Sequence, residues 1–139
     1  MKKYAPLILA ISLLSSPAKA DDIESLLRTC SNKSIDHVQQ TECLDAAASE
    51  SQNALSSAES AFQEYLSKAT DVASEDIQRV HNAFSERKHA FEAYRTKQCD
   101  FYAAMAMGGN GGHDVRLACT AVLNNEQAQQ LRWTVKYWK

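Results

Sequence analysis

Four cysteines are the residues of this chain with the most definite chemistry, since cysteine thiols form disulfides or bind metals. They are Cys30, Cys43, Cys99 and Cys119. Zinc sites need ligand pairs at short spacing, such as C-x2-C or H-x3-H, and the chain contains no such pair. An even number of cysteines in a small exported domain is typical of a disulfide framework. We therefore expect two disulfides, for which three pairings are possible, and no metal site.

The other reactive side chains do not form a catalytic pattern. Acidic residues such as Glu59 and Glu64 fall on solvated faces of expected helices, whereas a glycosidase needs two carboxylates across a cleft. Histidines are scattered, and none has a cysteine or serine nucleophile in a recognisable setting; they are His37, His81, His89 and His113. The sequence therefore predicts no catalytic residues, no enzyme activity and no cofactor.

A glycine-rich segment lies between the last two cysteines. It contains all four glycines of the chain and reads Gly108, Gly109, Asn110, Gly111, Gly112 and His113. Glycine adopts positive φ without strain, so this segment should end a helix and project as a narrow loop. We predict that Gly108–His113 contacts a partner, together with Arg95, which shares a helix face with Cys99. The alternatives are a plain flexible connection for the loop and, for Arg95, an ion pair with an acidic residue or the capping of carbonyl groups.

The beginning of the chain has the three parts of a secretory signal. An apolar run at 5–14 follows two lysines, and small residues precede Ala20. A membrane anchor needs about 20 apolar residues, and this run is shorter. We expect cleavage after Ala20, which makes residues 1–20 a signal peptide and residues 21–139 a single domain. The mature protein is then periplasmic or secreted, with no stable membrane insertion.

Charge is unevenly distributed along the expected mature chain. Residues 21–76 hold 12 acidic and 3 basic residues, a net charge of −9, whereas residues 77–139 hold 5 acidic and 9 basic residues, a net charge of +4. An acidic half attracts cationic partners and repels nucleic acid and anionic membranes. We therefore expect a cationic protein partner and no nucleic acid.

The longest uninterrupted helical pattern covers residues 37–68, which contain neither proline nor glycine and are rich in alanine, glutamate and glutamine. Asp36 is its expected N-cap, and Gln39 completes a capping-box pattern. A strict 4-3 spacing forms a stripe typical of a helix packed nearly antiparallel against another. The stripe consists of Leu44, Ala48, Ser51, Leu55, Ala58, Phe62 and Tyr65.

Further helices are expected on both sides of this one. A short helix can form at 21–28, a second long helix runs from about 75 to 107, and a shorter third one extends from Asn110 or Asp114, its candidate caps, to about 131. The second long helix should bury a stripe that includes Val80, Phe84, Phe91, Tyr94, Phe101 or Tyr102, and Met105. The aromatic tail at 133–139 should pack back on the body or form an exposed contact surface. The predicted fold is an all-α, small disulfide-stapled helical bundle with two long antiparallel helices and a shorter third helix.

Two groups of residues together resemble a known family. The spacing Phe91-x-x-Tyr94-Arg95-x-x-x-Cys99, followed by the glycine-rich segment and Cys119, resembles the LprI-like family of exported bacterial proteins. The upstream pattern agrees, since a capped helix start and an alanine-rich helix accompany Cys30, Asp36, Gln39 and Cys43. The resemblance covers roughly residues 30–132, and it departs from the family pattern at Phe91, usually tryptophan, and at Gln127, where an arginine is expected.

The resemblance implies a function, because the family is associated with lysozyme inhibition. It implies that the protein binds and blocks a peptidoglycan-cleaving enzyme, and the acidic half would attract a cationic one such as a lysozyme. The second interpretation is a structural or adaptor bundle of the cell envelope that inhibits nothing. Of the three disulfide pairings we favour Cys30–Cys43 and Cys99–Cys119, since the other two would force a terminal cysteine across the bundle. Phe91 and Tyr94 are then scaffold residues.

Overall fold

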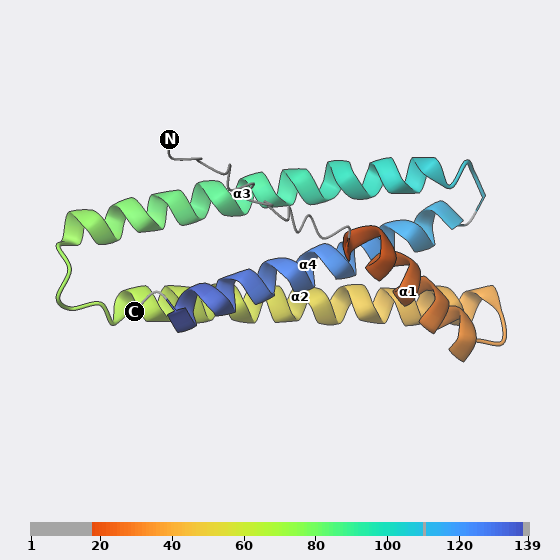
Figure 1. Ribbon diagram of the computed structural model, residues 1–139, viewed down its shortest axis with the longest axis horizontal. Helices are drawn as coiled ribbons and strands as arrows, with labels where there is room; N and C mark the ends of the chain where they lie inside the picture. The colour runs from red at the N-terminus through yellow and green to blue at the C-terminus, as the bar shows by residue number, and fades with distance from the viewer. Residues whose placement is uncertain (1–17, 110, 138–139) are drawn as a thin grey trace, which may run out of the picture.

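The computed structural model describes residues 18–109 and 111–137, which form four helices joined by short connections (Figure 1). The helices are α1 (Ala18–Lys33), α2 (His37–Ser67), α3 (Ser74–Met105) and α4 (Gly111–Tyr137). The expected all-α class is confirmed, with four helices rather than three. The first helix continues past residue 28, and α4, with 27 residues, is nearly as long as the 31-residue α2 and the 32-residue α3. The expected signal peptide lies mostly outside the described residues.

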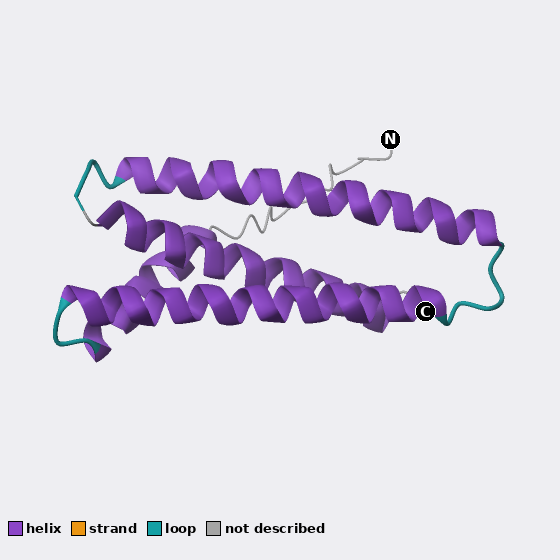
Figure 2. Cartoon of the chain, turned by 180° about the vertical axis from the view of Figure 1, so that it is seen from behind, coloured by secondary structure: helices purple, strands orange, loops and turns teal. Residues whose placement is uncertain are grey.

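Helix α4 occupies the centre of the bundle. It lies between α2 and α3 and runs in the same direction as α2, whereas α3 runs antiparallel to both (Figure 1). Helix α1 packs against α2 and α4 near one end, as the view from behind in Figure 2 also shows. The stripe on α2 packs mainly against α4. The two long antiparallel helices are therefore present, but the stripe packs mainly on the parallel α4 and meets the antiparallel α3 at Phe62, whose ring stacks on Phe84.

Small side chains explain why α2 packs closely on α4. Helix α2 buries Ser51 and Ala58, and α4 buries Ala118, Ala121 and Ala128. Small residues at a helix contact allow the two axes to approach. The buried residues of α3 are fewer and include the large Phe84. Helix α3 therefore packs less extensively on α4 than α2 does. It contacts α2 mainly through long side chains.

The apolar core has two parts that divide the bundle along its length. One cluster lies where the cysteines gather and includes Ile23, Leu44 and Leu123. The other lies toward the opposite end and includes Leu55, Phe62 and Phe84, with the rings of Phe62 and Phe84 stacked 4.6 Å apart. Partly buried Phe91 packs against both clusters, as expected of a scaffold residue. Burial of such side chains contributes roughly 1.5–3 kcal/mol each.

Capping explains where α2 begins. The Asp36 carboxylate accepts a hydrogen bond from the Gln39 backbone N–H at 2.9 Å, and the Gln39 side-chain oxygen accepts one from the Ile35 N–H at 3.1 Å. The predicted cap is confirmed, with the return bond one residue earlier than in the standard capping box. Helix α3 differs, because its N-cap is Ala73, which has no side chain able to cap. The start of α3 therefore has no side-chain cap hydrogen bond.

An ion pair joins α2 and α3 in the half of the bundle away from the cysteines. The Lys88 ammonium donates to the Glu59 carboxylate at 2.8 Å. This hydrogen bond, with the negative charges of Glu59 and Glu92, raises the pKa of Lys88 above its usual 10.5. Because the folded-state pKa is the higher one, the stabilisation is complete below pH 10.5 and disappears as the pH rises through the folded-state value.

We expect Lys88→Met to lower the free energy of unfolding at pH 7 by less than about 1 kcal/mol, since the lysine is partly exposed. The difference from the parent protein should stay constant from neutral pH to about pH 10 and shrink above it. Urea unfolding at several pH values measures this difference. A difference that persists unchanged at pH 12 would show that packing of the lysine stem, rather than the ion pair, stabilises the contact.

Candidate functional site

Both disulfides lie at the same end of the bundle. Cys30 bonds to Cys43 with a Cα–Cα distance of 5.6 Å, and Cys99 bonds to Cys119 at 5.5 Å, so the favoured pairing is confirmed. The first joins the end of α1 to the start of α2, and the second joins the end of α3 to the start of α4. We call this region the stapled end. It comprises residues 30–43, 99–109 and 111–119.

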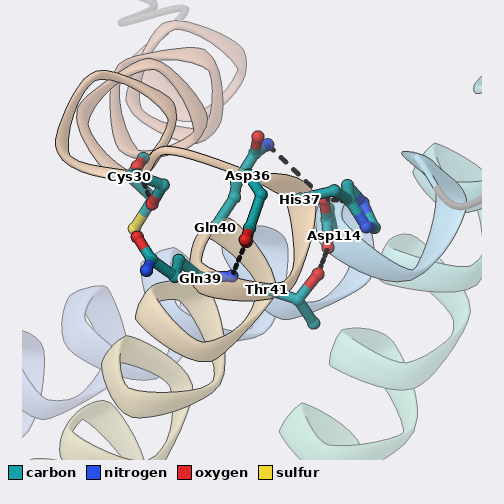
Figure 3. Close-up of polar contacts among 8 residues, drawn as sticks. Cys30, Asp36, His37, Gln39, Gln40, Thr41 and Asp114 are labelled. Carbon is teal, nitrogen blue, oxygen red and sulfur yellow. Dashed lines mark hydrogen bonds and ion pairs between the residues drawn. The ribbon is translucent and has the colours of Figure 1, made fainter.

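A buried aspartate adds a polar joint to the stapled end. Asp114, in the first turn of α4, is 3 % exposed. Its carboxylate accepts a hydrogen bond from the Thr41 hydroxyl at 2.8 Å, lies 3.0 Å from the His37 Nε2, and accepts a longer bond from the Gln40 amide at 3.4 Å (Figure 3). All three partners belong to the first turns of α2. The start of α2 is thus fixed to the start of α4, and the positive end of the α4 dipole favours the negative charge there.

The sequence did not reveal this joint. Asp114 was considered only as a helix cap, and its partners lie more than 70 residues away in sequence. Their spacing on α2 places Thr41 one turn after His37, which puts both on one face. The shared face indicates a contact with Asp114 only once α4 is known to lie beside α2. No local sequence pattern shows that these two helices are neighbours.

The glycine-rich segment forms a shorter loop than expected. Gly111, Gly112 and His113 belong to the first turn of α4, and Asn110 lies outside the described residues. The positive-φ residues are Met107 at 53°, Gly108 at 98° and Gly109 at 77°. Gly112 serves packing, since a Cβ there would lie 3.1 Å from the Ala103 carbonyl oxygen. The segment available for a contact is therefore the tight turn that includes Met107–Gly109.

Arg95 lies in a polar network between helices rather than beside the loop. Its guanidinium donates to the Asn124 side-chain oxygen at 2.5 Å and to the Gln52 side-chain oxygen at 3.1 Å, and it lies over the Phe91 ring. Asn124, which is fully buried, donates in turn to the Ser51 hydroxyl at 3.1 Å. The network joins α2, α3 and α4. Arg95 therefore bonds to neutral side-chain amides and not to an acidic residue, which was one alternative predicted from the sequence.

One aromatic expectation is corrected, and the structure distinguishes the two alternatives for the tail at two positions. Tyr94, expected in the core, is 45 % exposed on α3. In the tail, α4 continues to Tyr137, and Trp133 and Tyr137 are each 56 % exposed with their rings 5.3 Å apart. At these two positions the aromatic side chains of the tail are therefore exposed, as in the second of the two alternatives predicted from the sequence.

The stapled end carries exposed apolar side chains on both of its turns. They come from the α1–α2 connection and the start of α2, and from the end of α3 and the turn after it (Figure 1). Such residues gain free energy when a partner covers them. We call this set the apolar end surface: Ile35 at 87 % exposure, Val38 at 65 %, Phe101 at 56 %, Met105 at 59 % and Met107 at 89 %.

Acidic side chains line the helices next to this surface. Glu24 pairs with Arg28 and Glu64 with Lys68, each within one helix. No ion pair between the described side chains involves the remaining exposed acids of α1 and α2, which are Asp21, Asp22, Glu42, Asp45 and Glu50. The described side chains therefore neutralise the negative field of this half only partly.

The described residues contain neither a metal-binding cluster nor a candidate membrane span. Within 18–109 and 111–137, no three His, Cys, Asp or Glu side chains gather in a way that could hold a metal ion. None of the helices in that part of the chain is long and apolar enough to cross a membrane. Every buried side-chain nitrogen and oxygen there has a hydrogen-bond partner.

These features define a small, disulfide-stapled helical protein with a preorganised end. The comparison with protein families is consistent with this class. The model of the family described as lysozyme inhibitor LprI matches residues 30–131. The chain therefore belongs to the LprI family. Neither a curated protein nor a solved structure gives a significant match.

Proposed function

We propose that this protein is an exported inhibitor that binds a cationic peptidoglycan-cleaving enzyme, such as a lysozyme, through the apolar end surface. The observation that carries the proposal is the exposure of five large apolar side chains in and beside the two helix connections of the stapled end. Membership of a family described as lysozyme inhibitors supports the same kind of partner. Two disulfides in a chain of this size support export to an oxidising compartment.

Preorganisation explains how a small bundle can block a larger enzyme. The turn at Met107–Gly109 is tight, the Cys99–Cys119 disulfide holds its two helices together, and the Asp114 contacts fix the start of α4 to α2. A segment already fixed in its bound shape loses little conformational entropy on binding. In the proposed complex Met105 and Met107 enter the enzyme's cleft, and flexible methionine side chains adapt well to such surfaces.

The acidic side chains of α1 and α2 provide the electrostatic part of the interaction. Opposite charge on the partner accelerates association and is screened by salt, with a Debye length of about 10 Å at 0.1 M. The first turn of α4, including His113, is next to the proposed contact in the chain, whereas Arg95 lies in the network between the helices. Arg95 acts there by holding α3 against α2 and α4, and His113 is exposed at the start of α4.

The test is a single charge placed at the tip of the turn. We expect Met107→Glu to weaken inhibition of a cationic lysozyme by at least about tenfold, because a buried interface position must then accept an unpaired carboxylate. Met107 is 89 % exposed, so the fold should be unaffected. Inhibition constants from the clearing of a peptidoglycan suspension measure the effect.

Val72→Glu is the matched control, since Val72 is also an exposed apolar residue but lies in the α2–α3 connection at the other end. It adds the same charge and should leave inhibition unchanged. Inhibition by the parent should also weaken as NaCl rises from about 0.05 to 0.5 M. Equal inhibition by Met107→Glu and Val72→Glu would contradict the proposed contact. Absence of inhibition of every hydrolase tested would instead favour an adaptor bundle of the cell envelope.

A further inference from the structure

A groove lies between α3 and α4 in the half of the bundle away from the disulfides. It has a volume of about 570 Å³ and is lined by Arg87 of α3 and by Gln129, Gln130, Trp133 and Thr134 of α4. Small-molecule sites typically have volumes of about 300–1,000 Å³, with a mainly apolar wall and a few polar groups. The groove has this size and this kind of lining. The apolar end surface does not include any of its residues.

Arg87 gives the groove its charge. Its guanidinium donates to the Gln130 side-chain oxygen at 3.2 Å, and no ion pair between described side chains includes it. Arg28, Arg79 and Arg116, by contrast, each pair with a carboxylate. Partial burial lowers the pKa of Arg87, and the charge of Glu59 opposes this shift. A partly desolvated guanidinium with a neutral partner is suited to a carboxylate, which it can bind with two parallel hydrogen bonds.

The rest of the lining suits a hydroxylated ring. Trp133 is 56 % exposed and presents a flat apolar surface held on one side by the Tyr137 ring. Gln130 uses its side-chain oxygen to accept from Arg87, which leaves its amide N–H groups as donors. The Thr134 hydroxyl donates to the Gln130 carbonyl oxygen and keeps acceptor capacity. Donors, acceptors and an aromatic face thus accompany the positive charge.

We propose that this groove binds an acidic amino sugar, a pyranose that carries a carboxylate and an N-acetyl group, as N-acetylmuramic acid does. The carboxylate pairs with Arg87, the aliphatic face of the ring lies on Trp133, and the amides of Gln129 and Gln130 bind the N-acetyl and hydroxyl groups. Charge complementarity favours an anion, because Arg87 is the charged residue of the lining and forms no ion pair with a described carboxylate. The site would let the protein contact the cell wall itself, independently of enzyme inhibition.

Calorimetric titration of the exported, purified protein tests the proposal with three probes. They are N-acetylmuramic acid, N-acetylglucosamine, which lacks the carboxylate, and N-acetylglutamate, which lacks the sugar ring. We expect saturable binding of the first and at least roughly tenfold weaker binding of N-acetylglucosamine, the loss typical of a charge-assisted hydrogen bond. N-acetylglutamate should also bind at least roughly tenfold more weakly, because it lacks the ring that lies on Trp133. Arg87→Gln should reduce N-acetylmuramic acid binding to the level of N-acetylglucosamine, and Trp133→Ala should weaken both sugars.

Arg132→Gln is the matched control, because Arg132 is exposed beside Trp133 but does not line the groove. It should leave binding unchanged, and circular dichroism should show the same helix content in all variants. Three results would overturn the proposal: no saturable binding up to about 10 mM, equal binding of the two sugars, or preference for N-acetylglutamate. Inhibition of a lysozyme by Arg87→Gln should equal that of the parent, so this site and the proposed inhibitory contact can fail separately.

Discussion

Replacing Cys99 and Cys119 together by alanine is expected to lower the free energy of unfolding by about 3 kcal/mol, a large part of the stability of a small domain. The disulfide closes a loop with a sequence separation of 20, and both cysteines are almost fully buried in the core cluster of the stapled end. Its loss frees the unfolded chain and leaves a small void in the folded one. Urea unfolding at pH 7 measures the change.

The Cys30→Ala/Cys43→Ala variant is the natural comparison. Its separation of 13 gives nearly the same loss, about 3 kcal/mol, in the chain-entropy model. Cys43 is only partly buried, so the packing contribution should be smaller and the total cost slightly lower. Inhibition should suffer more from the loss of Cys99–Cys119, which supports the turn with Met107. An unchanged unfolding midpoint when the parent protein is reduced would contradict both expectations.

The sequence determined α2 and the disulfides well because both depend on local information. The 4-3 stripe identified Leu44, Ser51, Leu55, Ala58 and Phe62, all of which are buried. No glycine or proline interrupts the pattern, and Asp36 marks the start. Each disulfide joins two cysteines that are close in sequence, so the pairing depends little on how the helices are arranged in the bundle. Local periodicity and short loops were sufficient for these features.

The stripe on α3 was predicted less well, and packing gives the reason. Phe84 is buried and, of the alternatives Phe101 and Tyr102, Tyr102 packs against the core, but Val80 and Met105 are 40 % and 59 % exposed. Helix α3 packs on α4 and meets α2 only through side chains such as Phe84 and Lys88, so a narrow strip of its surface is covered. An apolar stripe indicates which side chains of a helix can be buried. Whether a neighbour covers them depends on the arrangement of the whole bundle.

The candidate site was predicted only in part for the same reason. The turn at Gly108 and Gly109 follows from the glycines, whereas the exposure of Ile35 and Val38 at the same end follows from the fold of α1 onto α2. Asp114 and Asn124 are polar residues on a helix expected to bury apolar ones. Their partners lie on α2 and α3, and no sequence pattern connects these distant positions.

Asn124→Ala is expected to lower the free energy of unfolding by about 3 kcal/mol, more than the loss of one ordinary hydrogen bond, because it breaks a buried network. Asn124 is fully buried and accepts from Arg95 while it donates to Ser51 and Gln52. Alanine removes these bonds and leaves a partly buried guanidinium with one acceptor fewer. The unfolding midpoint in urea measures the loss, and Asn125→Ala, at the exposed neighbouring position, should change it by less than about 0.5 kcal/mol.

The double variant Arg95→Met/Asn124→Ala decides which role Arg95 has. If the arginine is structural, removing its charge together with the asparagine should recover part of the stability lost in Asn124→Ala alone, since no unpaired guanidinium remains. Inhibition by the folded double variant should then equal that of the parent. Strict additivity of the two substitutions would contradict the network. Loss of inhibition in a fully folded Arg95→Met protein would instead place Arg95 at the partner surface, and the Tyr94-Arg95 spacing would then reflect recognition rather than the packing of α3 onto α2 and α4.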